Sequence, residues 1–229
     1  MKRFYKNAAA AEFEGAPAVL LDGKPVRTPK RLLLHLPTLG LADAIAGEWN
    51  SQQDEIRPAD MPMTQMATTA LDRIAPQIGA VAAEVARFAE TDLVCYRAET
   101  PESLVEVQHA AWSPLLQWLE AELDARLMVT TGIQPIPQPA DAIARVQNAV
   151  ARYEAFPLAA LSTATAITGS VVIALALAHQ RIDGDAAANA AHVDEVFQMQ
   201  RWGADPEAEA NLRRIRTELQ AVERFLALL

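Results

Sequence analysis

The feature that most constrains the fold is a long run without charge: no Asp, Glu, Lys or Arg occurs between Ala155 and Gln180. The run is long enough to cross a lipid bilayer as one helix. Small and polar residues interrupt it at Ser162, Thr163, Thr165, Thr168, Gly169 and Ser170. A helix that is small and uncharged on every side suits a place enclosed by other helices in a protein core, although it also suits packing within a membrane. We therefore expect one central helix and no membrane insertion, with a membrane-anchored structural protein as the alternative.

The composition is that of an ordinary folded protein. At 229 residues, with 51% hydrophobic and 21% charged residues, the chain can form one or two domains without disulfides or metals. Its net charge of -9 repels phosphate backbones, so nucleic acid is not an expected partner. Cys95 is the only cysteine, which excludes an intrachain disulfide and fits a reducing compartment. The N-terminus lacks the apolar segment of a signal peptide, so a cytoplasmic protein is expected.

The N-terminal part has the pattern of short strands. Residues 18–36 read as strands around Asp22-Gly23, a pair typical of hairpin turns. A helix is expected over residues 38–53, and the proline-containing segment 57–62 reads as a linker. We therefore place an N-terminal β-rich domain with one helix at residues 1–62.

The remainder, residues 63–229, has the apolar spacing typical of helices. Pro76 is expected to kink or divide the first of these helices, and Pro114 to kink the second. The predicted fold class is therefore α+β, with a small β-rich domain followed by a larger all-helical domain at 63–229.

A segment near the C-terminus predicts a helix with two different faces. Val193, Val196 and Phe197 share one side, as in an ordinary core stripe. A second side is lined, at i, i+3, i+4 and i+7, by Glu195, Gln198, Met199 and Trp202. Gly203 is expected to end this helix and Pro206 to open the next one. The second side is typical of a surface that grips a protein, and the alternative is a helix buried on both sides with Glu195 satisfied internally.

Motifs for catalysis or cofactor binding are absent from the sequence. The glycine-rich nucleotide loops, His-Glu-x-x-His and Gly-x-Ser-x-Gly do not occur. His192 and Glu195 are spaced to share one helix face, but we expect no metal there. An alternative function is a small-molecule enzyme with an acidic Glu195/His192 cleft between the domains.

Many short motifs follow one another along almost the whole chain. They are Arg3-Phe4-Tyr5-Lys6, Leu21-Asp22-Gly23-Lys24-Pro25-Val26, Glu48-Trp49, Met61-Pro62, Thr91-Asp92-Leu93, Cys95-Tyr96-Arg97, Gln108 with Trp112, Gly169-Ser170, and Asp194-Glu195 with Trp202-Gly203. With these motifs the sequence resembles the family of chaperones that assemble the F1-ATPase head of ATP synthase by binding its α-subunit. Ser113 departs from the acidic residue expected before Pro114.

The resemblance implies an ATP-independent chaperone, with no catalytic activity and no cofactor, that shields the β-facing surface of the unassembled α-subunit. It marks Glu195 and Trp49 as important for chaperone action. The residues expected to bind the partner are Glu195, Gln198, Met199, Trp202, Trp49 and Glu48. Eukaryotic members work in the mitochondrial matrix, whereas this chain, without a transit peptide, is expected in the bacterial cytoplasm.

Flexible methionines are suitable material for adaptable apolar contacts with such a client. The sequence offers them at Met61, Met63, Met66 and Met199.

Overall fold

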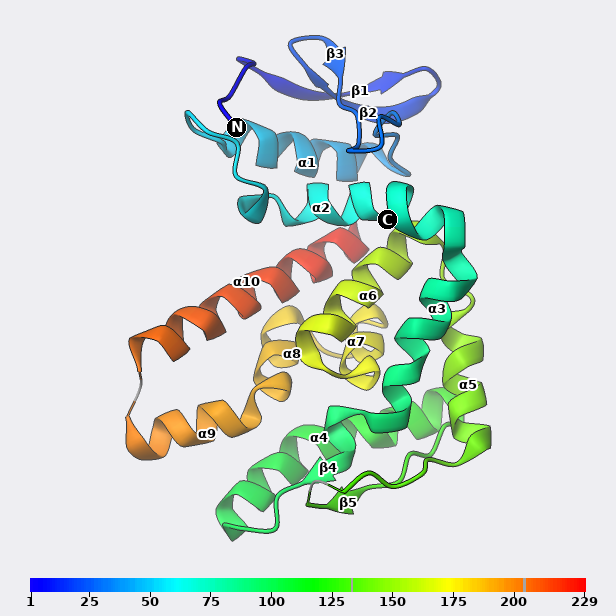
Figure 1. The fold of residues 1–229 in the computed structure, drawn as a ribbon, viewed down its shortest axis with the longest axis vertical. Helices are drawn as coiled ribbons and strands as arrows, with labels where there is room; N and C mark the ends of the chain where they lie inside the picture. Colours follow the sequence, from blue (N-terminus) through cyan, green and yellow to red (C-terminus); the bar gives the residue numbers. More distant parts are fainter. Residues whose placement is uncertain (133, 204) are drawn as a thin grey trace. The chain divides into compact units, whose positions relative to one another are not determined.

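The computed structural model describes residues 1–132, 134–203 and 205–229, which form two compact units. The first unit consists of Met1–Ile78, Glu154–Ala160 and Arg224–Leu229, and the second of Gly79–Tyr153 and Leu161–Glu223. A small β-sheet region opens the chain and helices dominate the rest (Figure 1), so the predicted α+β class is confirmed.

A three-stranded antiparallel sheet packs on a helix in the first unit (Figure 1). Strand β1 (Ala8–Phe13) pairs with β2 (Ala16–Leu21), which pairs with β3 (Lys24–Pro25). Asp22 and Gly23 form the turn before β3, with φ values of 47° and 81°, as the Asp-Gly pair predicts.

Helix α1 (Leu39–Ser51) begins where Thr38 caps it, because the Thr38 hydroxyl oxygen accepts a hydrogen bond from the backbone N–H of Leu41 at 3.1 Å. Its face toward the sheet buries Leu41 and Ile45 completely. Burial of this face fixes α1 against the sheet, which would be too thin to stand alone.

Pro76 divides the next helical stretch, as expected. Helix α2 (Pro62–Thr69) passes into a π-helical turn, Ala70–Ile74, and a 3₁₀ turn, Ala75–Gln77, before α3 (Ile78–Ala86) begins. Proline has no N–H to donate and its ring collides with the preceding turn, so the regular hydrogen-bond ladder cannot continue.

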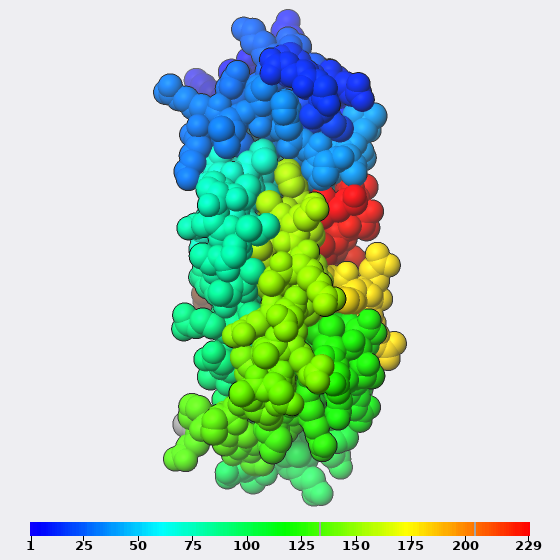
Figure 2. All heavy atoms as spheres, turned by 90° about the vertical axis from the view of Figure 1, so that its right-hand side faces the viewer, coloured from blue at the N-terminus to red at the C-terminus, as the bar shows by residue number. Residues whose placement is uncertain are grey.

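The second unit is mainly helical, with one small parallel sheet. Its elements are β4 (Tyr96–Arg97), α4 (Glu102–Leu123), β5 (Thr130–Thr131), α5 (Ala140–Val150), the later part of α6 (Ala155–Thr168), α7 (Val171–Ala178), α8 (Gly184–Ala191), α9 (Val193–Trp202) and most of α10 (Pro206–Ala227). Helix α4 continues through Pro114. On the face seen in Figure 2, α3 lies beside α5, which packs against the 3₁₀ segment that follows α3.

The uncharged run forms two helices, α6 and α7, so the expectation of one central helix is wrong. Gly169 adopts a left-handed conformation with φ of 65°, and Ser170 then caps α7 by accepting a hydrogen bond from the backbone N–H of Ile173 at 3.0 Å. Every residue from Val171 to Leu177 is buried, which confirms an enclosed position for α7. None of the helices in the described chain combines the length and apolar character that crossing a bilayer requires.

A buried carboxylate ties the start of α7 to the segment before β4. Asp92 is fully buried and accepts hydrogen bonds from the Ser170 hydroxyl at 2.5 Å and from the backbone N–H groups of Val172 and Val94. Burial raises the pKa of Asp92 to about 6 although these donors oppose the shift. Cys95 is also fully buried, and burial together with the charge of Asp92 raises the pKa of its thiol to about 12.

Candidate functional site

Helix α9 carries the side chains that the sequence analysis placed on one face. It runs from Val193 to Trp202 and ends at Gly203, whose φ is 95°. Val193 is its only buried residue, whereas 57% of the Glu195 side chain and 73% of Trp202 are exposed. The alternative of a helix buried on both sides with Glu195 sealed inside is therefore wrong.

Glu195 presents a negative charge at this exposed face. Its Oε2 atom lies 3.6 Å from Nδ1 of His192, one turn earlier. The neighbouring imidazole of His192 lowers the pKa of Glu195 and outweighs the opposing effect of partial burial. Glu195 is thus ionised at neutral pH while most of its side chain remains in solvent.

Asp194 points from α9 in a different direction and anchors the helix to α4. One of its oxygens, Oδ1, accepts a hydrogen bond of 2.7 Å from the side-chain amide of Gln108. Gln108 is buried, and its own Oε1 accepts a hydrogen bond from the backbone N–H of Ala98 at 2.8 Å. A chain of hydrogen bonds therefore links α9, α4 and the segment after β4.

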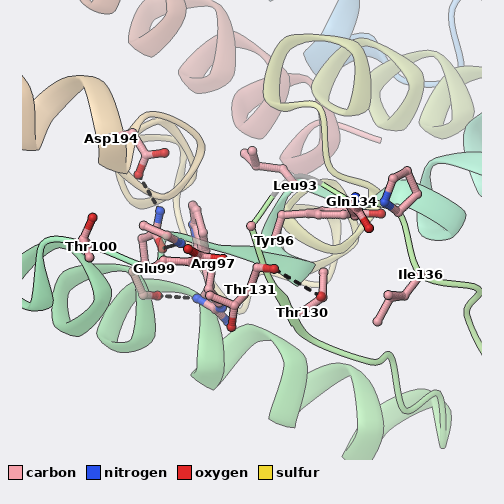
Figure 3. A pocket seen from close by; sticks show the side chains of 15 residues that line it. Leu93, Tyr96, Arg97, Glu99, Thr100, Thr130, Thr131, Gln134, Ile136 and Asp194 are labelled. Carbon is pink, nitrogen blue, oxygen red and sulfur yellow. Dashed lines mark hydrogen bonds between the residues drawn. The ribbon is translucent and has the colours of Figure 1, made fainter.

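A pocket of about 870 Å³ lies beside this anchor (Figure 3). Residues of β4, β5 and the segments that follow them line it together with Gln108, Trp112 and Asp194. Trp112 is 1% exposed and donates a hydrogen bond of 2.6 Å to the carbonyl of Ala190. The guanidinium of Arg97 lies 4.8 Å from the Trp112 ring centroid and donates to the carbonyl of Gln108 at 2.6 Å.

Sequence reasoning missed this pocket. In the sequence, the motif Cys95-Tyr96-Arg97 and the pair Gln108 and Trp112 stand out only as part of the family resemblance. Two short parallel strands more than thirty residues apart create the pocket, and their apolar periodicity is too brief to signal a sheet.

Glu48 lies in the first unit and is only 9% exposed. Its carboxylate accepts hydrogen bonds from the backbone N–H groups of Met63 and Thr64 and from the Thr64 hydroxyl, at 2.7, 2.8 and 2.7 Å. Burial raises the pKa of Glu48 despite these donors. Any contribution of Glu48 to partner binding would therefore act through the position of α2.

Trp49, also in the first unit, is partly exposed. The Trp49 and Tyr5 rings pack in a T-shaped arrangement with centroids 5.5 Å apart, and the Tyr5 hydroxyl donates a hydrogen bond of 2.6 Å to the Trp49 carbonyl. The indole Nε1 is buried and has no hydrogen-bond partner among the described residues. The structure thus places Glu48 and Trp49 together on α1, and the other four partner-binding candidates together on α9.

The four methionines expected to contact the client divide into two groups. Met61, Met63 and Met66 are between 2% and 5% exposed, so the expectation that they offer adaptable surface contacts is wrong. Their side chains fill the interior of the first unit, where a flexible thioether suits an irregular space. Met199 on α9 is partly exposed.

A histidine and a carboxylate also lie close together at the start of α9. Within the described ranges, no three His, Cys, Asp or Glu side chains lie together as a metal ion would require. The pocket at β4 and β5 includes Asp194 but neither His192 nor Glu195, the pair named for the alternative enzymatic function.

Comparisons with known proteins agree with this architecture. Residues 2–120 match the family model described as ATP12 chaperone protein. The chain is 25% identical to the mitochondrial protein atp12 of Schizosaccharomyces pombe over 215 residues, which cover 89% of this chain and 74% of the relative.

Solved structures of bacterial relatives are similar throughout. The crystal structure of Atp12 from Paracoccus denitrificans has a TM-score of 0.90 and 41% identity, and the match covers 99% of this chain and 97% of that one. A crystal structure of a candidate chaperone from Agrobacterium tumefaciens has a TM-score of 0.92 and 39% identity, with 99% and 85% of the two chains covered. The chain therefore belongs to the ATP12 family of ATP synthase assembly chaperones.

Proposed function

We propose that this protein binds the unassembled α-subunit of F1-ATPase, shields the apolar surface that later faces the β-subunit, and thereby promotes assembly of the catalytic head. Family membership supports a role in ATP synthase assembly. The observation that supports direct binding is the outward face of α9, where Trp202 is 73% exposed and the Glu195 side chain 57% exposed. The proposal includes no catalytic step and no nucleotide.

The chemistry of this face fits a binder that must later release its client. An exposed indole can bury a large apolar area in a complementary pocket, and such anchors contribute about 2 kcal/mol or more each. Glu195 adds a charge, which favours one orientation of the client more than it raises overall affinity. A surface with few anchors binds tightly enough to prevent aggregation and still yields to the β-subunit.

The proposal also concerns the compartment. The two bacterial relatives are about 40% identical to this chain. The match covers 97% of the Paracoccus protein and 85% of the Agrobacterium protein. The bacterial origin of these relatives supports action in the bacterial cytoplasm, whereas the relative from Schizosaccharomyces pombe is a mitochondrial protein.

The proposal is tested by the substitution Glu195→Lys. Purified α-subunit is diluted from denaturant, without nucleotide, into an equimolar amount of the chaperone, and light scattering reports aggregation. We expect the wild type to suppress scattering and Glu195→Lys to lose this protection. The melting temperature should change little, because the Glu195 side chain is 57% exposed and an ion pair in contact with solvent contributes about 1 kcal/mol or less to stability.

The matched control is Gln200→Lys, an exposed position on the opposite side of α9. This variant should protect the α-subunit as the wild type does. Loss of folding in Glu195→Lys would assign the residue a structural role, and aggregation of the α-subunit in the presence of the wild type would refute the proposed client.

A further inference from the structure

We infer that the pocket beside α9 receives a basic side chain, an arginine or a lysine, from an extended segment of the client. The inference rests on the proposed function and adds a second contact, separate from the outward face of α9. It follows from the pocket's size, from carboxylate oxygens that have no partner among the described residues, and from the distribution of charge over the chain.

The pocket is already formed in the free protein, and hydrogen bonds hold part of its wall in place. Its volume of about 870 Å³ lies in the range that accepts a long side chain with its neighbouring peptide groups. Trp112 and Gln108 form part of the wall, are buried, and are each held by hydrogen bonds. A site whose walls are already fixed loses little conformational entropy when it is filled.

Two carboxylates at the pocket have acceptor oxygens to offer (Figure 3). Glu99 is exposed, and no hydrogen bond or ion pair to it exists within the described chain. Asp194 uses Oδ1 to hold Gln108, which leaves Oδ2 without a partner among the described residues. A cationic side chain is the complement of such a pair, since charge-assisted hydrogen bonds are the stronger kind.

Arg97 is the one basic residue of the lining, and its charge is already engaged. Its guanidinium lies over the Trp112 ring and donates to the Gln108 carbonyl. Burial lowers the pKa of Arg97, as expected for a cation that has lost part of its hydration. The lining as a whole therefore keeps an excess of negative charge.

The wider distribution of charge acts in the same direction. The first unit carries ten basic and ten acidic residues, and the second carries ten basic and nineteen acidic residues. The entire net charge of -9 thus lies on the unit that holds the pocket. A field of this sign attracts basic client segments and repels acidic ones.

The strands at the pocket suit an extended segment. The sheet of β4 and β5 has two strands, so in the described part of the chain each strand has an edge without a strand partner. Such edges accept added strands through backbone hydrogen bonds.

The test uses labelled peptides that differ in one central residue. Fluorescein-labelled Thr-Val-Arg-Val-Thr, and the same peptide with Gln or Glu in place of Arg, are titrated into the full-length protein while anisotropy is recorded. We expect the Arg peptide to bind best, and binding to shift the backbone amide NMR signals of Thr130, Thr131 and Gly132. Equal binding of the Arg and Gln peptides, or tighter binding of the Glu peptide, would overturn the inference.

A variant of Glu99 tests whether a carboxylate of the pocket binds the Arg peptide. Glu99→Gln should weaken binding of the Arg peptide about 2- to 5-fold, as the loss of one charge pair at an exposed site does. Glu106→Gln is the matched control, because Glu106 is exposed on α4 and does not line the pocket. An equal loss in both variants would mean that only overall charge matters, which would also overturn the inference.

The same variants separate this inference from the proposed function. If the wild type protects the α-subunit and Glu99→Gln retains its full affinity for both the α-subunit and the Arg peptide, the pocket inference is wrong and the proposed function stands. If the wild type binds the Arg peptide through Glu99 but not the α-subunit, the pocket inference stands and the proposed client is wrong.

Discussion

Asp92 shows how one buried side chain joins distant parts of the second unit. It accepts hydrogen bonds from Ser170 and Val172, at the start of α7, and from Val94, two residues further along its own segment. Its pKa is about 6 in the folded protein and near the ordinary value of about 3.9 in the unfolded chain. Between these pH values the folded state binds a proton that the unfolded state does not, so stability falls as the pH rises through this range.

The substitution Asp92→Asn should remove this pH dependence. We expect the free energy of unfolding of the wild type to fall by roughly 2–3 kcal/mol more than that of the variant between pH 4 and pH 7. Urea unfolding at the two pH values measures the difference. Asp22→Asn is a control for which the pH dependence of stability has the opposite sign. Backbone N–H groups of Asn7 and Lys6 lower the pKa of Asp22, so its contribution to stability grows as the pH rises. Parallel pH profiles for wild type and Asp92→Asn would show that another group titrates here.

At the scale of elements, α8 and α10 approach so closely that only glycine fits between them. A Cβ atom on Gly184 would lie 2.7 Å from the backbone nitrogen of Gln220 and 2.8 Å from its Cα. The backbone N–H of Gly184 also donates a hydrogen bond of 2.8 Å to Glu223. Because the obstacle is backbone rather than the tip of a side chain, one helix would have to move to admit a methyl group.

Gly184→Ala should therefore destabilise the protein by about 1–3 kcal/mol, the usual effect of overpacking. Thermal unfolding followed by circular dichroism measures the loss. Gly79→Ala in α3 is the matched control, since no heavy atom lies within 4 Å of its added methyl group. Helix propensity predicts that this control stabilises the protein by up to about 1 kcal/mol. Similar melting temperatures for the two variants would contradict the close approach.

Substitution of Trp202 tests whether the exposed face of α9 binds the α-subunit. Trp202→Ala should weaken binding of the α-subunit by about 30-fold, the equivalent of one anchor of about 2 kcal/mol. The melting temperature of the Trp202→Ala variant should match that of the wild type, because the indole is mostly in solvent. Isothermal titration calorimetry gives the affinity, with Gln200→Ala on the opposite side of α9 as the control. Unchanged affinity would remove Trp202 from the binding surface.

Local signals predicted the elements whose ends depend on one residue. Thr38 marks the start of α1, Pro76 interrupts the helical stretch around it, and Gly203 with Pro206 separates α9 from α10. These residues act through backbone sterics and capping, which operate within a few positions of the chain.

Elements that depend on distant partners could not be predicted in the same way. Strand β1 consists mostly of alanine, a poor strand former, and exists because β2 pairs with it and α1 covers it. The break between α6 and α7 depends on Ser170 meeting Asp92, far away in sequence. The pocket likewise depends on β4 finding β5.

At the scale of the whole molecule, charge is distributed unevenly between the two units. The first is neutral and the second carries the net charge of -9. Counting along the sequence gives the same division, because residues 1–78 are already neutral and the late segments Glu154–Ala160 and Arg224–Leu229 add one acidic and one basic residue. The membership of these two late segments in the first unit, in contrast, could not be read from the sequence. The family and the fold class could be predicted from the sequence, because the order of the motifs and the helical periodicity can be recognised without knowledge of tertiary contacts.

This distribution predicts that ionic strength acts mainly on association. Raising salt from about 50 to 500 mM should slow binding of the α-subunit by about tenfold or more, because screening removes long-range attraction to the second unit. The dissociation rate should change far less. Stopped-flow fluorescence gives both rates, and sucrose solutions of matched viscosity control for slower diffusion. An association rate independent of salt would exclude steering by this charge.

The burial of Cys95 has a practical consequence. A thiol with a pKa near 12 and no exposed surface has almost no thiolate at neutral pH, so maleimides and disulfide reagents should leave the folded protein unlabelled. A substitution such as Gln198→Cys would then introduce the single reactive handle of the chain without any need to replace the native one. Spin labels or photoactivatable probes attached there could map which neighbour touches α9, residue by residue, in an otherwise natural background.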